Sequence, residues 1–212
     1  LLLGDYLFSK AGSLASTTEN LRVIRRFSET LMTISGGELR EGSHIFDLAV
    51  ARDNYYKWIG DKTACLFVMA SECGSVLSGC PEEQVQALKD YALNFGLAFQ
   101  IIDDILDFVG DPSTLGKPIG SDLNEGAATL PSILYAEKNP KDGTIQAIIR
   151  DHRKDLVPVA VEKVRSSGTI DECRSIAEGF AQKASLSLDK LPDCDARRSL
   201  KALVAFVIER NR

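Results

Sequence analysis

The sequence predicts an all-α fold, a bundle of antiparallel helices, from two observations. Apolar residues recur every three or four positions through most of the chain, as they do from Leu21 to Ile34. No segment alternates apolar and polar residues in the way that a half-buried strand does. Helix start and stop residues also separate the periodic stretches, so we expect several consecutive helices.

The first half of the chain divides into four predicted helices. The apolar run that opens at Leu1 has no preceding cap and begins with Leu instead of Met, so we expect that the natural N-terminus lies upstream. A second helix begins after residues 17–20. A third extends from Asp53 to about Gly79. The fourth extends from about Pro81, a residue suited to the first turn of a helix, to Val109.

The second half of the chain begins with a predicted loop. Residues 110–129 are rich in Gly, Pro, Ser and Asp, which favour turns. A short helix is predicted at about 131–137. Three amphipathic helices are predicted at about 144–167, 170–188 and 193–210, with a kink at Pro158. Because no repeat or low-complexity linker interrupts this pattern, we expect one domain over 1–212, incomplete at its N-terminus.

The composition excludes several classes of protein. Of the 212 residues, 44% are hydrophobic and 26% charged, as in a soluble globular protein, and the net charge of −5 argues against nucleic-acid binding. No apolar run is long enough for a transmembrane segment, and no signal segment opens the chain. The five scattered cysteines fit a reducing compartment, so we expect a cytoplasmic protein.

Three carboxylates, Asp103, Asp104 and Asp107, interrupt one of the most apolar stretches of the chain. At about 100° per residue they share a narrow polar stripe with Gln100. No basic residue lies within one helical turn, and buried carboxylates must pair, take up protons or bind metal. Their hard oxygens suit Mg²⁺ that also binds phosphate. A solvated helix face is the alternative, and the apolar surroundings disfavour it.

Two lysines are candidates for the opposite wall of such a site. Lys62 occupies a position where the helical period predicts an apolar residue, so it either reaches the surface or points into a polar cavity. Lys117 lies between Gly116 and Gly120, where glycines let the backbone approach a ligand and a lysine can neutralise a polyanion. Without a Walker-type glycine loop, an apolar diphosphate is the better ligand.

These residues form patterns that resemble trans-isoprenyl diphosphate synthases. The family's second aspartate-rich region is similar to Phe99-Gln100-x-x-Asp103-Asp104-x-x-Asp107, Gly116-Lys117-x-x-Gly120-x-Asp122-Leu123 and Glu125-Gly126-x-x-Thr129-Leu130-Pro131. The family's Lys-Thr motif is similar to Tyr55-x-x-x-Ile59-x-x-Lys62-Thr63-Ala64. The resemblance covers at least residues 1–136 in register.

The resemblance implies an all-α fold around a deep central cavity, usually as a homodimer. It implies Mg²⁺-dependent condensation of isopentenyl diphosphate with an allylic prenyl diphosphate, giving a longer polyprenyl diphosphate. By position, Asp103 and Asp104 resemble the family's metal ligands, and Asp107 resembles a more peripheral or water-mediated ligand. Lys62 and Lys117 resemble the residues that clamp the diphosphate. Thr63 and Gln100 resemble the polar groups near the ionising carbon.

Two departures keep other interpretations open. The family's first aspartate-rich motif would lie upstream of Leu1, and Ala127 stands where many members have a lysine. A regulatory or partner-dependent subunit of a heteromeric synthase, a class I terpene cyclase and a binding module without turnover are the alternatives. Whether this chain is active alone stays open.

Basic residues near the C-terminus, such as Arg197 and Arg210, suit helix-end charge or a weak contact with anionic membrane.

Overall fold

The computed structural model describes residues 1–44, 51–110, 116 and 118–210. This part of the chain is helical and has no strand, as predicted. In chain order its elements are the helices α1 (Leu2–Ser16), α2 (Leu21–His44) and α3 (Ala51–Ile59), the π-helical turn η1 (Gly60–Ala64), and the helices α4 (Cys65–Leu77), α5 (Glu82–Val109), α7 (Ser121–Glu125), α8 (Leu130–Lys138) and α9 (Thr144–Arg150), then the 3-10 turn η2 (Lys154–Leu156), α10 (Val157–Ser166), α11 (Thr169–Ser187), the 3-10 turn η3 (Leu188–Lys190) and α12 (Asp195–Glu209).

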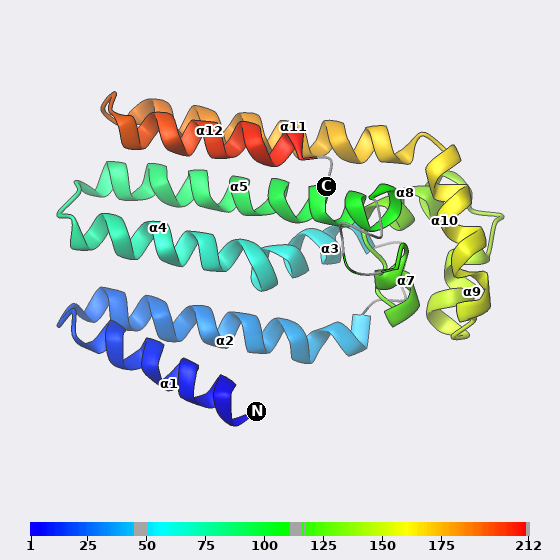
Figure 1. Cartoon of the computed structure of the whole chain (residues 1–212), viewed down its shortest axis with the longest axis horizontal. Coiled ribbons are helices and arrows are strands. Elements are labelled where there is room, and N and C mark those ends of the chain that lie inside the picture. The colour runs from blue at the N-terminus through cyan, green and yellow to red at the C-terminus, as the bar shows by residue number, and fades with distance from the viewer. Residues whose placement is uncertain (45–50, 111–115, 117, 211–212) are drawn as a thin grey trace.

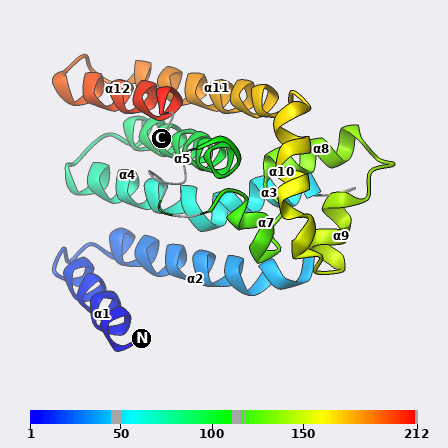
Figure 2. The ribbon, with the colours of Figure 1, turned by 45° about the vertical axis from the view of Figure 1, so that its right-hand side comes forward.

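The long helices lie side by side, with α5 at the centre. Helices α11 and α12 lie along one side of α5, and α4, α2 and α1 follow in turn on the other side (Figure 1). The turned view keeps this order and places α7 to α10 together at one end of the molecule (Figure 2). Helix α5 therefore contacts both halves of the bundle, and its C-terminal part, with the aspartates, lies near that end.

Two local predictions were wrong. The predicted loop at 110–129 contains the short helix α7, whose first turn is held by the Asp107 carboxylate. The predicted helix at 144–167 is divided into α9 and α10, and His152 between them has a φ of 53°, in the left-handed region. Pro158 lies in the first turn of α10 and does not kink a helix, because that position needs no N–H donor.

The core around the end of α5 is almost closed to solvent. Ile101, Ile105 and Phe108 are each 0% exposed. In the same turns Asp104 is 2% exposed and Asp107 0%. Two of the three predicted site carboxylates are therefore truly buried, so each needs hydrogen-bond donors from the protein or a cation.

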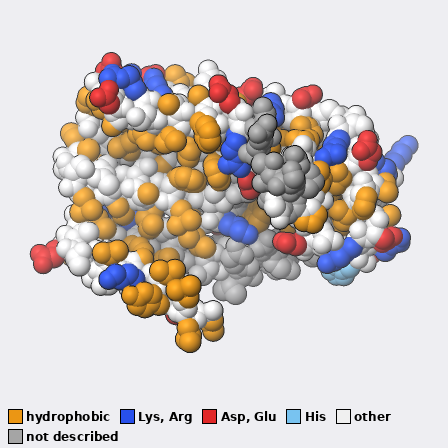
Figure 3. Space-filling model, in the orientation of Figure 1, with side chains coloured by type: hydrophobic (Ala, Val, Ile, Leu, Met, Phe, Trp, Pro, Cys, Tyr) orange, Lys and Arg blue, Asp and Glu red, His pale blue; other side chains and the backbone are white. Residues whose placement is uncertain are grey.

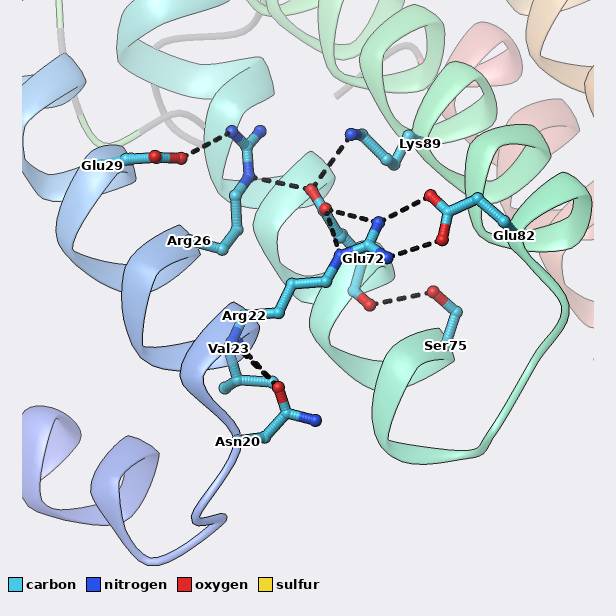
Figure 4. A network of polar contacts seen from close by, with 9 residues as sticks. All are labelled: Asn20, Arg22, Val23, Arg26, Glu29, Glu72, Ser75, Glu82 and Lys89. Carbon is cyan, nitrogen blue, oxygen red and sulfur yellow. Dashed lines mark hydrogen bonds and ion pairs between the residues drawn. The ribbon is translucent and has the colours of Figure 1, made fainter.

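A separate ion-pair network fastens α2 to α4 and α5 near the start of α5 (Figure 4). Glu72 of α4 is buried, and its carboxylate lies 3.0 Å from Arg22, 3.1 Å from Arg26 and 3.3 Å from Lys89. Arg22 also pairs with Glu82 at 2.6 Å. Because a buried carboxylate needs this compensation, the network fixes the position of α2 at the end of α5 away from the aspartates.

Helix α1 contributes no buried residue to the fold. Its apolar side chains are exposed, as the hydrophobic cluster at the lower edge of Figure 3 shows, with Leu3 at 70% and Leu7 at 57%. Apolar surface of this kind is typical of a contact with another polypeptide. Within the described ranges, no helix has the length and apolar character that a membrane crossing requires.

Candidate active site

The Lys-Thr pair lies on a π-helical turn. Lys62 and Thr63 belong to η1, which interrupts the helical run between α3 and α4. Such turns insert an extra residue into a helix and are frequent at functional sites. The turn packs against Gly96 of α5, where an added Cβ would lie 2.6 Å from the Cα of Ala64. Only glycine at position 96 therefore allows η1 to approach α5 this closely.

A continuous chain of hydrogen bonds joins this turn to the acidic helix. The Thr63 hydroxyl donates to Gln100 Oε1 at 2.7 Å, and Gln100 Nε2 donates to Asp104 Oδ1 at 2.9 Å. The Tyr55 hydroxyl donates to the other oxygen, Asp104 Oδ2, at 2.5 Å. Thr63, Gln100 and Asp104 were all predicted to belong to the site, and the structure brings these three together.

The environment of Asp104 favours its neutral form. Burial raises the pKa of Asp104 to about 7, while the hydrogen bonds from Tyr55 and Gln100 act to lower it. The charges of Asp122 and Asp103 raise it further. A nearby cation would act in the opposite direction, because positive charge favours the ionised carboxylate.

Asp103 points to a different partner. The side chain is 44% exposed, and Oδ1 accepts a hydrogen bond from Arg210 at 2.8 Å. The Arg210 guanidinium also lies 5.1 Å from the centre of the Phe99 ring, a cation–π distance. Of the three aspartates, Asp103 is the one with solvent access, and its counter-charge comes from a residue just after α12.

Asp107 fastens α7 to the end of α5. Its Oδ1 accepts from the Ser121 hydroxyl at 2.8 Å, and its Oδ2 accepts from the Asp122 backbone N–H at 3.2 Å. The Asp107 backbone carbonyl also accepts from the Gly120 N–H at 2.8 Å. Gly120 has a φ of 73°, which glycine adopts without strain. Asp107 thus anchors Gly120 and the first turn of α7 to the end of α5.

The two predicted lysines differ in what the structure shows. Lys62 is exposed, and its ammonium lies 5.0 Å from the centre of the Trp58 ring. Lys117 lies outside the described residues. Lys62 is next to Thr63 on η1, so it adjoins the hydrogen-bond chain that leads to the acidic helix.

The three carboxylates suit a metal ion that is bound jointly by protein and substrate phosphate better than one that is bound by protein alone. Asp104 and Asp107 already accept hydrogen bonds on both carboxylate oxygens, whereas Asp103 is open to solvent. No group of three or more His, Cys, Asp or Glu side chains in the described ranges is arranged to hold a metal. Mg²⁺ typically uses one or two carboxylates and completes its shell with phosphate oxygens and water. The residues present fit that mode of binding.

Three residues that take part in this arrangement were not predicted from the sequence. Tyr55 and Asp122 were noted only as parts of the patterns that resemble the family. Arg210 lies 107 residues from Asp103 along the chain, so no sequence spacing could have paired them. A hollow of about 710 Å³ beside Asp142 and Thr144 is lined by none of the predicted site residues.

Comparison with known proteins finds related sequences. A sequence model of the family described as polyprenyl synthetase matches residues 1–164. Octaprenyl diphosphate synthase from Escherichia coli (strain K12) is 34% identical over 216 residues, covering 100% of this chain and 67% of that protein. Solanesyl diphosphate synthase 2, chloroplastic, from Arabidopsis thaliana is 32% identical over 212 residues. The matched region covers 99% of this chain and 50% of that protein.

A similar fold is found in a solved structure. The polyprenyl synthase from Caulobacter crescentus CB15, crystallised with calcium and isoprenyl diphosphate, superposes with a TM-score of 0.92 at 35% identity, covering 100% of this chain and 66% of that one. The chain thus spans between about half and two thirds of the length of these three relatives. The family model covers most of the chain and the fold matches that of a solved polyprenyl synthase, so the chain belongs to the polyprenyl synthetase family.

Proposed function

We propose that this protein condenses isopentenyl diphosphate with an allylic prenyl diphosphate to make a longer polyprenyl diphosphate, with Mg²⁺ as its divalent cation. The main support is the hydrogen-bond chain from Thr63 through Gln100 to Asp104, which links the Lys-Thr turn to the aspartate helix. Relatives of the chain are synthases of octaprenyl and solanesyl diphosphate, so a long-chain product is the expectation.

The aspartates and lysines have separate roles in this proposal. Asp103 and Asp104, with Asp107 more peripheral, would hold the cation together with the substrate diphosphate. The bound cation would supply positive charge to the departing diphosphate. Lys62 and Lys117 would clamp the same diphosphate, since an ammonium group is a mobile point charge for phosphate oxygens.

The remaining groups act on the prenyl carbons. Thr63 and Gln100 place polar oxygens near the carbon that ionises. Phe67 and Phe99, whose ring centres lie 5.7 Å apart, are the side chains that would give the prenyl tail an apolar surface. An apolar surface suits a prenyl tail and keeps water from the carbocation, which would otherwise be hydrolysed. The leaving diphosphate is the expected acceptor for the proton lost at the end.

Product analysis tests the reaction directly. The intact protein is incubated with isopentenyl diphosphate, an allylic diphosphate and Mg²⁺, and the products are separated by chain length. Elongated linear products are expected. Cyclic hydrocarbon without elongation would instead indicate a class I terpene cyclase. Turnover that appears only after a second synthase subunit is added would indicate a partner-dependent subunit.

The proposal extends to the assembly and its location. We propose one all-α domain that forms a homodimer in the cytoplasm, and the exposed apolar side of α1 supports a protein partner. Sedimentation should give twice the mass of one chain, and a monomer at micromolar concentration would contradict the dimer. A weak membrane contact gains no support from the basic residues near the C-terminus, because Arg197 pairs with Asp189 and Arg210 with Asp103.

A further inference from the structure

Tyr55 is a buried residue whose hydroxyl meets a residue of the candidate site. Its side chain belongs to α3 and is only 3% exposed. The ring packs near Tyr56 and Trp58, with centres 5.6 Å and 6.3 Å away, while the hydroxyl donates to Asp104 at 2.5 Å. A phenylalanine would keep the ring contacts, so the contribution of the hydroxyl can be separated from the contribution of packing.

The directions of the hydrogen bonds show which residue controls the others. A carboxylate held in its ionised form by a nearby cation can only accept, so Asp104 then requires the NH₂ side of the Gln100 amide, as the contact from Nε2 to Oδ1 shows. The carbonyl side of that amide then faces Thr63, whose hydroxyl is able to donate or to accept. The position of the Asp104 carboxylate therefore fixes the orientation of Gln100, and Gln100 in turn fixes the Thr63 hydroxyl.

Burial makes the donor to each carboxylate oxygen important. Asp104 is 2% exposed and lies among apolar residues such as Ile101 and Ile105. Gln100 occupies one carboxylate oxygen and Tyr55 the other. Removing the Tyr55 hydroxyl leaves the carboxylate held from one side, so it can rotate about its terminal bond and take Gln100 with it.

We propose that Tyr55 is a positioning residue of this site, acting through Asp104 to orient the Gln100 amide and the Thr63 hydroxyl beside Lys62. The inference rests on the proposed function, because only a diphosphate substrate gives these oriented groups their role. Residues that orient metal ligands or polar site groups typically change metal affinity or activity by about 10- to 100-fold when they are replaced.

The test compares two buried tyrosines that each lose a hydroxyl. Tyr55→Phe removes the donor to Asp104. Tyr91→Phe is the matched control, since Tyr91 is 4% exposed and its hydroxyl contacts the Leu200 carbonyl at 3.4 Å. Binding is followed through Trp58, the only tryptophan of the chain, which lies near Tyr55 and under Lys62. The probe is inorganic pyrophosphate titrated in the presence of Mg²⁺.

Tyr55→Phe should weaken binding of the magnesium pyrophosphate about 10-fold or more and lower kcat in the elongation assay, with circular dichroism like wild type. Tyr91→Phe should bind and turn over like wild type. Equal binding and turnover in the two variants would overturn the proposal. Failure of the wild type itself to bind the probe or elongate would instead reject the proposed function.

A second variant covers the case in which Tyr55→Phe does not fold. Gln100→Leu cuts the same chain at a half-buried position, so it tests the link from Asp104 to Thr63. Its expected result is again weakened binding of magnesium pyrophosphate. Binding as tight as wild type in Gln100→Leu would show that the chain does not position the site, and it would overturn the proposal.

Discussion

Gly96 has a hydrogen atom where alanine would have a methyl group, and this difference decides how closely η1 approaches α5. Gly96 is buried against Ala64, and a Cβ at position 96 would lie 2.7 Å from the Ala64 Cβ and 3.1 Å from the Phe67 ring. Ala64 is 0% exposed, so the turn has little room to move. The contact sets the distance over which Thr63 reaches Gln100, and the site therefore depends on glycine at this position.

Gly96→Ala should lower the free energy of unfolding by about 1–3 kcal/mol, because a methyl group is forced into a packed contact. Gly179→Ala is the matched control: it lies within α11, where a Cβ meets nothing within 4 Å. That change should stabilise the protein by about 0.5–1 kcal/mol, the usual gain when alanine replaces a helical glycine. Denaturant unfolding measures both, and equal effects would contradict the packing argument.

The contrast between Asp104 and Arg210 shows how far the sequence could predict the site. Helical periodicity placed Gln100, Asp103 and Asp104 on one stripe, because a single helix carries all three. Tyr55 opens the Lys-Thr pattern in the sequence, but the pattern does not reveal that its hydroxyl reaches Asp104 on another helix. Arg210 meets Asp103 only through the packing of α12 against α5, which no local pattern encodes.

At the scale of elements, Asp142 ties together three helices near the end of the molecule. Its carboxylate accepts hydrogen bonds from Tyr135 of α8 at 2.6 Å and from Lys163 of α10 at 2.7 Å. It also accepts from the Thr144 backbone N–H at the start of α9, at 3.0 Å. The Lys163 ammonium, with help from Thr144 and Tyr135, holds the pKa of Asp142 well below its usual range.

The depressed pKa predicts how stability depends on pH. Asp142 stabilises the fold at pH values above its unfolded pKa of about 3.9, and this contribution is lost as the pH falls toward the lower folded pKa. Asp142→Asn should therefore cost about 1.5 kcal/mol at pH 7, and the difference from wild type should shrink below about pH 4. Denaturant unfolding from pH 3 to pH 7 measures this difference in the free energy of unfolding.

An exposed ion pair provides the control for this prediction. Asp155 pairs with Arg153 at 2.7 Å on the surface, so Asp155→Asn should change stability little at any pH. A pH-independent difference between Asp142→Asn and wild type would contradict the assignment of the stabilisation to the charged carboxylate.

The element boundaries also show what periodicity could and could not predict. The long helix α5 was predicted within a residue of its observed start and at its observed end, because Pro81 and Gly110 mark them. Helix α7 was missed, since its five residues lie in a stretch of turn-forming composition. The Asp107 side chain stabilises it from another element, and that tertiary contact has no signature in local sequence.

At the scale of the whole molecule, α5 carries two unlike polar groups at its two ends. Near its start Lys89 takes part in the buried network around Glu72, which fastens α2 to the bundle. Near its end Asp103 and Asp104 face the Lys-Thr turn and the residue that follows α12. The first group fastens α2 to the bundle, and the second belongs to the proposed diphosphate site.

We propose above all that Asp103, the solvent-accessible carboxylate near the end of α5, serves prenyl transfer. The most direct measurement is the rate at which the intact protein incorporates labelled isopentenyl diphosphate into longer products with Mg²⁺, comparing wild type with Asp103→Ala. The control is Asp90→Ala, a half-buried position on the same helix that contacts Gln86. Asp103→Ala should lower kcat by about 100-fold or more while Asp90→Ala keeps wild-type turnover. Undiminished turnover in a folded Asp103→Ala variant would contradict the account.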